Sequence, residues 1–215
     1  MTTGKKIHHR RSSRLQGYDY SQAGAYFVTI CTRDRECLLG EITVGADSRV
    51  FPEMRLNDAG RAVQQCWIAI PDHFPHVELD VFVVMPNHVH GIVVIVDGRG
   101  TACRAPTAEQ FGCPVSGSIP TIFRSFKSAV TKCINEMRGT RGEKLWQRNY
   151  WEHIVRNESE LNRIREYIQN NPAQWELDKL YPGGGDGLGT GRGTACRAPT
   201  VRDSAPEYGK EVWMI

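Results

Sequence analysis

Two histidines separated by a single residue are the side chains of this sequence best suited to chemistry. They are His88 and His90, in the segment Met-Pro-Asn-His-Val-His-Gly-Ile-Val that runs from Met85 to Val93. Alternate residues of a β-strand point to the same face, so a strand here would place both imidazoles side by side and turn Val89 toward the core. Two adjacent imidazoles are a frequent start of a metal site. Histidine pairs on strands are also found as ordinary hydrogen-bonded polar residues, and the pair alone leaves both interpretations open.

A tyrosine and an asparagine later in the chain offer matching functions. Tyr167 and Asn171 are four residues apart, which on a helix places them on one face, one turn from each other. Asn171 would then supply an oxygen ligand, and Tyr167 would present its hydroxyl beside the metal. The alternatives are a core tyrosine with a hydrogen-bonded hydroxyl, and an asparagine that ends the helix before Pro172.

The elements that must position these residues follow from the periodicity of apolar side chains. We expect strands at 25–31, 37–42, 77–85, 88–96 and 153–155, and helices at 58–70, 118–137 and from 158 to 170 or 171. This order is typical of an α+β fold, a ferredoxin-like sandwich with an antiparallel sheet and helices packed mainly on one face.

Local signals set the ends of these elements. Asn57 and Asn157 are expected helix N-caps, the second forming a capping box with Glu160, and Pro71 is expected to stop the first helix. Pro86-Asn87 is the expected turn of a hairpin. The apolar stripe expected on the helix at 118–137 consists of Ile122, Phe126, Ala129, Val130, Cys133 and Met137.

Composition and charge limit the class of protein. The 215 residues carry a net charge of +3 and seven cysteines without a Cys-x-x-Cys spacing, which argues against a disulfide framework and a structural zinc site. The cysteine pattern predicts a reduced, cytoplasmic protein. Because there is no long apolar run, we expect no membrane contact. The predicted organisation is a basic N-terminal arm at 1–17, one catalytic domain at 18–180 with a flexible insertion at about 97–117, and a Gly-rich, mostly disordered tail at 181–215.

The same ten residues, Gly-Arg-Gly-Thr-Ala-Cys-Arg-Ala-Pro-Thr, occur at Gly98–Thr107 and at Gly191–Thr200. Each residue of the decamer and its mirror partner have complementary codons available, and this symmetry ends at both flanking residues. We interpret the decamers as two in-frame copies of a hairpin-forming inverted repeat in the gene, with a duplicated loop peptide as the alternative. If AGG encodes the first arginine, the repeat contains the tetranucleotide GTAG.

Several motifs together resemble the REP-associated tyrosine transposases, which are relatives of the single-tyrosine insertion-sequence transposases. The resemblance covers most of residues 10–96 and 119–176, and the decamers and the Gly-rich tail have no counterpart in the family pattern. The family belongs to the HUH endonuclease class, named for a His-hydrophobic-His motif. The matching segments are Arg10–Glu36, Met85–Val93, Leu145–Arg148, Trp151–His153 and Tyr167–Pro172.

The resemblance implies a metal-dependent endonuclease and strand transferase of single-stranded DNA. It implies that His88, His90 and Asn171 hold Mg²⁺ or Mn²⁺, and that Tyr167 attacks a phosphate polarised by this metal and forms a 5′-phosphotyrosine. The family acts on palindromic repeats that fold as hairpins, frequently with GTAG at the 5′ foot, and the GTAG available in the decamer agrees with this substrate. Religation from a covalent intermediate needs no nucleotide cofactor.

Hairpin DNA is therefore the expected partner, of a monomer or a homodimer. Either Tyr150 or Trp151 is a possible stacking surface for unpaired bases, and His153 is interpreted as a strand residue without a known role. Two other functions stay open: a catalytically inactive hairpin-DNA-binding protein, and an HUH nuclease of the replication-initiator or relaxase type. The side chains expected to contact DNA are Lys5, Lys6, Arg10, Arg11, Arg14, Arg124, Lys127 and Arg148.

Overall fold

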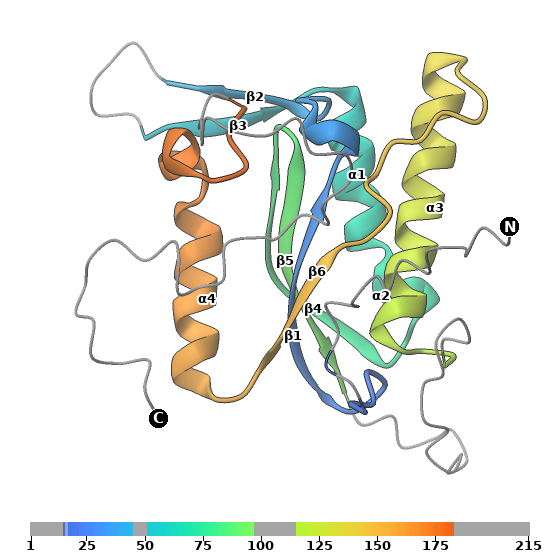
Figure 1. Cartoon of the computed structure of the whole chain (residues 1–215), viewed down its shortest axis with the longest axis vertical. Helices are drawn as coiled ribbons and strands as arrows, with labels where there is room; N and C mark the ends of the chain where they lie inside the picture. Colours follow the sequence, from blue (N-terminus) through green and yellow to red (C-terminus); the bar gives the residue numbers. More distant parts are fainter. Residues whose placement is uncertain (1–14, 16, 45–50, 97–114, 183–215) are drawn as a thin grey trace, which may run out of the picture.

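The computed structural model describes residues 15, 17–44, 51–96 and 115–182, and the structural statements below concern these residues (Figure 1). Most of the predicted basic arm, of the predicted insertion and of the predicted tail lies outside the described residues, as do both decamers. Their roles stay predictions.

The centre of the molecule is an antiparallel sheet of four strands in the order β4-β5-β1-β6. Strand β1 (Gly24–Cys31) lies between β5 (His88–Ile95) and the edge strand β6 (Trp151–Val155), and β4 (Val77–Met85) forms the other edge. With a helical segment of two α-helices between β1 and β4 and a single helix between β5 and β6, the chain follows the β-α-β-β-α-β order of a ferredoxin-like sandwich. The predicted fold class is confirmed.

Helices cover the two faces of the sheet unequally (Figure 1). Helices α1 (Asp58–Ile68), α2 (Ile70–His73) and α3 (Ile119–Arg138) pack on one face, where they bury the larger hydrophobic cluster. Helix α4 (Glu158–Asn170) packs on the other face and closes a smaller cluster. Because side chains of a strand alternate between faces, each central strand contributes to both clusters, and the α4 side is the one that contains the candidate site.

Both predicted asparagine caps are present. The Oδ1 atom of Asn57 accepts a hydrogen bond from the Gly60 N–H at 2.9 Å, and Oδ1 of Asn157 accepts one from the Glu160 N–H at 2.8 Å. The Glu160 carboxylate reaches the N–H of Arg156 at 2.8 Å rather than that of the cap residue, so the capping box is reciprocal only in a shifted form.

The predicted stop at Pro71 was wrong in one respect. The chain turns at Ala69 and then forms the short helix α2, with Pro71 in its first turn. A proline is tolerated there, since the first N–H groups of a helix have no partner within the helix.

The apolar stripe of α3 also differs from the prediction. Ile122, Phe126 and Val130 are buried as expected, but Ala129 and Met137 are exposed. The buried face is instead completed by other apolar side chains, namely Ile119, Pro120, Phe123 and Ile134. The helix is rotated in this way because it packs against α1 as well as against the sheet.

Short elements complete the described fold. The predicted strand at 37–42 is displaced to β2 (Gly40–Thr43), which pairs with β3 (Glu53–Leu56) in a separate two-stranded sheet. Strand β3 was not predicted; its Glu-Met-Arg-Leu sequence alternates as a half-buried strand does, but it is only four residues long. Two 3-10 helices, η1 (Arg33–Arg35) and η2 (Pro172–Leu177), follow β1 and α4. No described helix combines the length and the apolar character that a membrane span requires.

Gly91 allows Trp67 to pack against the sheet. A Cβ at this position would overlap the Trp67 ring and lie 2.9 Å from the Cβ of Phe82, on which Trp67 stacks. We therefore expect Gly91→Ala to lower the free energy of unfolding by about 3 kcal/mol, measured by urea denaturation. Adding Trp67→Phe should recover part of this loss, because the smaller ring leaves room for the methyl group; a purely additive double variant would contradict the packing argument.

Candidate active site

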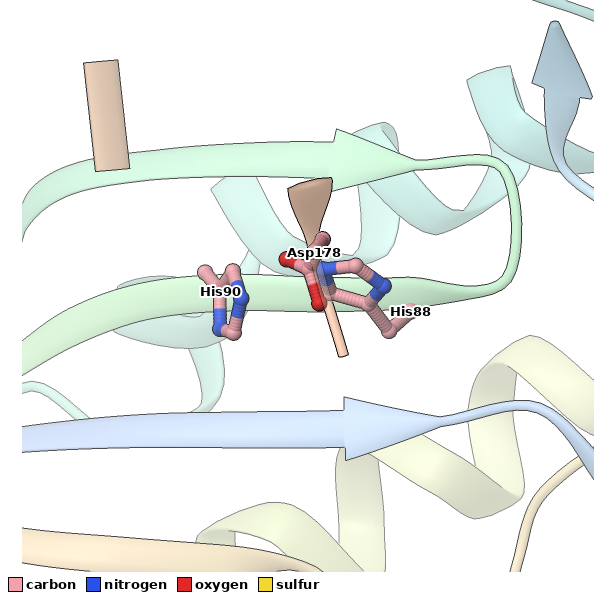
Figure 2. Close-up of side chains that lie close together, drawn as sticks. All are labelled: His88, His90 and Asp178. Atoms are coloured by element: carbon pink, nitrogen blue, oxygen red, sulfur yellow. The ribbon is translucent and has the colours of Figure 1, made fainter. Parts of the chain in front are cut away.

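The two histidines of β5 lie on the α4 side of the sheet. His88 and His90 are both 0 % exposed, their ring centroids are 4.4 Å apart, and Val89 between them points into the opposite cluster. Figure 2 shows the imidazoles next to each other on the strand, with Asp178 close to both. The predicted strand geometry is present, and both imidazoles are fully buried.

The hydrogen bonds of Asn87 determine the tautomer of His88. The Nδ2 group of Asn87 donates to the carbonyl oxygens of Leu180 at 2.7 Å and Arg35 at 3.1 Å. Its Oδ1 therefore remains as an acceptor, and it lies 2.8 Å from Nδ1 of His88. Nδ1 must carry the proton, so Nε2 presents a lone pair, and this buried nitrogen has no hydrogen-bond partner among the described residues.

His90 connects β1 with α4. Its Nδ1 lies 2.8 Å from Oγ1 of Thr29, the residue that faces it in the strand register. Its Nε2 lies 3.2 Å from the hydroxyl oxygen of Tyr167. The tyrosine predicted as nucleophile is thus adjacent to the imidazole nitrogen best placed to bind a metal.

Burial keeps both imidazoles neutral. It lowers the pKa of His88 to about 3; the Asn171 side chain opposes this shift, and the charge of Arg35 adds to it. Burial and the neighbouring His88 lower the pKa of His90, and Asp178 opposes the change. Neutral imidazoles have the lone pair that a metal ligand requires.

Helix α4 brings Tyr167 and Asn171 to the histidines. Ile164 and Ile168, both fully buried, pack against Phe27 and Ile92 on this face of the sheet. Tyr167 and Asn171 follow at the end of the same helix, where Asn171 also serves as the residue that caps α4 before Pro172. The helix-ending role and the site role of Asn171 are therefore compatible.

A bidentate ion pair fixes α4 to the edge strand β4. Arg165 donates from Nε to both carboxylate oxygens of Asp80, at 3.1 and 3.0 Å, and from Nη2 to Oδ2 at 2.6 Å. The side chains of Arg165 and Asp80 are 35 % and 17 % exposed. These hydrogen bonds lower the pKa of Asp80, as expected for a carboxylate paired with guanidinium.

We expect Asp80→Asn to lower the free energy of unfolding by about 1 kcal/mol at pH 7, a value that allows for solvent screening. Because the pKa of Asp80 is lower in the folded protein than in the unfolded chain, the ion pair stabilises the fold above the unfolded pKa. This stabilisation is lost as the pH falls through the folded pKa. Urea denaturation at pH 7 and at about pH 3 should show the difference between wild type and variant shrinking at the lower pH. An equal difference in the free energy of unfolding between wild type and variant at the two pH values would contradict a charge effect.

The segment after α4 covers the histidines and adds a carboxylate that was not predicted. Trp175 of η2 lies over His88 with 5.8 Å between ring centroids. Asp178 offers an oxygen that lies, with one nitrogen of each histidine, in a group of atoms within 4.8 Å of one another. Asn171 is 2 % exposed, and its Oδ1, like Nε2 of His88, has no hydrogen-bond partner among the described residues. Buried polar atoms of this kind, together with neutral imidazoles and a carboxylate, fit a divalent metal.

Three site residues were not identified from the sequence. Thr29 lies on the same face of β1 as Phe27, and Asn87 precedes the histidines in their motif. The period of the strand was therefore a usable signal for Thr29, and the motif position was one for Asn87. Asp178 had no such signal, because it follows the last predicted helix and reaches the site only through the turn formed by η2.

The residues predicted to contact DNA are not gathered at this site. The five basic residues of the arm lie outside the described residues. Arg124 and Lys127 belong to α3, on the opposite face of the sheet, and Nζ of Lys127 donates to the carbonyl oxygens of Gln147 and Arg148. Lys127 therefore has a structural role, and burial lowers its pKa to about 8. Arg124 and Arg148 are exposed. The contacts of Arg124, Lys127 and Arg148 with DNA stay predictions.

The two predicted stacking residues lie on different faces. Tyr150 packs with Phe123 in the larger cluster. Trp151 lies on the α4 side, 5.4 Å from the ring of Phe27 and 5.8 Å from that of His153, which is parallel to it within 6°. Of the two, Trp151 shares the face of Tyr167.

Relatives of the chain can now be compared with this site. No protein-family model matches the sequence. An uncharacterized protein of Haemophilus influenzae is 45 % identical over 181 residues, which cover 81 % of this chain and 94 % of that protein. The chain belongs to the same family as this Haemophilus influenzae protein.

A second Haemophilus influenzae protein, described as "Putative REP-associated tyrosine transposase", is 25 % identical over 158 residues, 73 % of this chain and 74 % of that protein. The resemblance predicted from the motifs is confirmed.

Two solved structures are also similar. One is a REP-associated tyrosine transposase bound to a REP hairpin, with 19 % identity, a TM-score of 0.46, and 79 % of this chain and 74 % of that chain covered. The other is described as a "putative transposase" of Deinococcus radiodurans R1, with 17 % identity, a TM-score of 0.40, and 73 % and 97 % covered.

Proposed function

We propose that this protein is a metal-dependent endonuclease and strand transferase that acts on single-stranded DNA through a tyrosine nucleophile. The observation that carries the proposal is the position of the Tyr167 hydroxyl, 3.2 Å from Nε2 of His90, beside a buried His88 nitrogen and an Asn171 oxygen that have no partners among the described residues. The relation to REP-associated tyrosine transposases supports an enzyme that cleaves and joins DNA.

In the proposed reaction, the Tyr167 oxygen attacks the phosphorus of a phosphodiester. The bond between phosphorus and the 3′ oxygen breaks, so that a 5′-phosphotyrosine and a free 3′-hydroxyl result. The tyrosine loses its proton and the departing 3′ oxygen gains one. Attack by another 3′-hydroxyl on the phosphotyrosine reverses these bond changes and joins a new strand, without a nucleotide cofactor.

The residues present fit a divalent cation. His88, His90 and Asn171 would hold it, and the Asp178 carboxylate lies close by, with an oxygen within 4.8 Å of one nitrogen of each histidine. A bound Mg²⁺ or Mn²⁺ would supply positive charge that withdraws electrons from a phosphate oxygen. The mixture of imidazole and oxygen donors favours Mn²⁺ over Mg²⁺, and phosphate and water oxygens would serve as the remaining ligands of either ion.

The proposed substrate is a DNA hairpin formed by a palindromic repeat. One solved structure of similar fold is described as bound to a REP hairpin, and the repeated decamer of this chain permits a palindromic coding sequence that contains GTAG. Tyr167 is only partly buried, so the phosphate approaches from the side of the tyrosine.

The test is a covalent trapping assay. The full chain is incubated with a single-stranded hairpin that carries GTAG at its 5′ foot and a label at its 3′ end, because the 3′ fragment is the one that stays on the tyrosine. The reactions contain Mg²⁺, Mn²⁺ or EDTA and are run on a denaturing protein gel. We expect a labelled protein band with either metal, none with EDTA, and none with a fully paired duplex of the same sequence. Tight hairpin binding without any adduct would favour the catalytically inactive binding protein instead.

A further inference from the structure

We propose that Asp178 is a positioning residue that holds the side-chain amide of Asn171 with its oxygen toward the histidine pair. The inference rests on the proposed metal site and adds a residue to it that no sequence motif contains. It concerns a choice between two orientations, since the oxygen and the NH₂ group of an asparagine have nearly the same shape and opposite hydrogen-bonding properties.

The contacts of Asp178 leave one orientation. Nδ2 of Asn171 lies 3.1 Å from Oδ2 of Asp178, and a carboxylate can only accept hydrogen bonds, so the NH₂ group must face it. The Oδ1 atom at the other end of the amide is buried and has no hydrogen-bond partner among the described residues. The Asn171 side chain is close enough to the His88 imidazole to interact with it, so this oxygen lies beside the histidine pair.

Asp178 is itself held in place. Its Oδ1 accepts a hydrogen bond from the Leu180 N–H at 2.6 Å, and the side chain is largely buried. Both carboxylate oxygens therefore have donors already, which favours a supporting role over direct ligation, although an Asp178 oxygen lies within 4.8 Å of a nitrogen of each histidine.

The same short segment orients a second ligand. The carbonyl oxygen of Leu180 accepts a hydrogen bond from Nδ2 of Asn87 at 2.7 Å. This bond orients the Asn87 amide, so that its Oδ1 faces His88 and fixes the tautomer of that histidine. Residues 178–180 thus direct the lone pair of His88 and the oxygen of Asn171 toward the same site. Supporting groups of this kind commonly account for a 10- to 100-fold difference in metal affinity.

The test is a double-variant cycle measured by Mn²⁺ titration calorimetry of the full chain, without DNA. Asp178→Asn places an NH₂ group against either the Leu180 N–H or the Asn171 NH₂ group, so the Asn171 amide loses its orientation. We expect Asp178→Asn to weaken Mn²⁺ binding about 10- to 100-fold. In an Asn171→Asp background, Asp178→Asn should not weaken Mn²⁺ binding, because a carboxylate at position 171 presents an oxygen in either orientation.

The outcomes separate the possible roles of Asp178. Equal weakening in both backgrounds would overturn the proposal and make Asp178 a direct ligand. Glu176→Gln, which removes a charge from an exposed side chain of the same segment, should leave the affinity unchanged and controls for net charge. If Asp178→Asn does not fold, Asp178→Ser replaces it in both backgrounds with the same expectations.

Failure of the inference and failure of the proposed function are distinguishable. Suppose that the wild type binds Mn²⁺ and that Asp178→Asn weakens binding only when residue 171 is asparagine, but that no covalent adduct forms on hairpin DNA. This result would overturn the proposed reaction alone. A wild-type protein without saturable Mn²⁺ binding would overturn both the metal site and the role of Asp178.

Discussion

Replacing Tyr167 with phenylalanine will abolish the covalent protein–DNA adduct and leave hairpin binding unchanged. The substitution removes one oxygen atom, and the ring keeps its packing 6.1 Å from Phe27 and 5.3 Å from His90. Loss of the nucleophile commonly lowers the rate of covalent catalysis by about 10⁴- to 10⁶-fold. The denaturing-gel assay measures the adduct, and a gel-shift titration with the same labelled hairpin measures binding.

Tyr150→Phe is the matched control, since this tyrosine belongs to the cluster on the opposite face of the sheet. The control variant should form adduct at the wild-type rate. Adduct that persists in Tyr167→Phe and disappears in Tyr150→Phe would move the nucleophile to Tyr150. Loss of hairpin binding in Tyr167→Phe would show that the hydroxyl contributes to binding rather than to chemistry alone.

His88→Ala is expected to remove metal binding and, with it, the adduct. In the wild type, Mn²⁺ at about 100 times its dissociation constant should raise the free energy of unfolding by about 2.7 kcal/mol, because the ion binds only the folded protein. The variant lacks the Nε2 lone pair that Asn87 directs into the site, so this rise should be absent. Urea denaturation with and without Mn²⁺ measures the effect for each protein.

His153→Ala controls for the general loss of an imidazole. His153 hydrogen-bonds Glu160 at 2.7 Å and stacks on Trp151, while the ring of Phe27 lies between Trp151 and His90. Its removal should leave the stabilisation by Mn²⁺ intact. An equal loss of metal stabilisation in both variants would place the metal somewhere other than at the pair on β5.

The two variants test different parts of the proposed reaction. Tyr167→Phe leaves the metal ligands in place and removes the attacking oxygen, whereas His88→Ala leaves that oxygen and removes a ligand. If both retain hairpin binding and lose the adduct, binding and chemistry are separable functions of one domain. The experiment also decides between a transposase and a binding protein, because a protein without catalytic activity would form no adduct before substitution.

The sequence by itself determined most of the elements and most of the candidate site. Period-two alternation in Met85–Val93 placed His88 and His90 on one face of a strand, and the spacing of Tyr167 and Asn171 placed them on one face of a helix. Asn157 and Pro172 bounded that helix closely. These features are local, since they depend on the period of one element and on the residues that begin or end it.

Only the tertiary structure decided which face α4 covers and what reaches the histidines from beyond it. Nothing in the periodicity of α4 specifies the sheet face on which it packs; burial of Ile164 and Ile168 against Phe27 and Ile92 does so. Asp178 enters the site because η2 turns the chain back over His88. Such a contact depends on the path of the chain after the helix, which no local pattern contains, and so the carboxylate that holds Asn171 could be found only in the folded molecule.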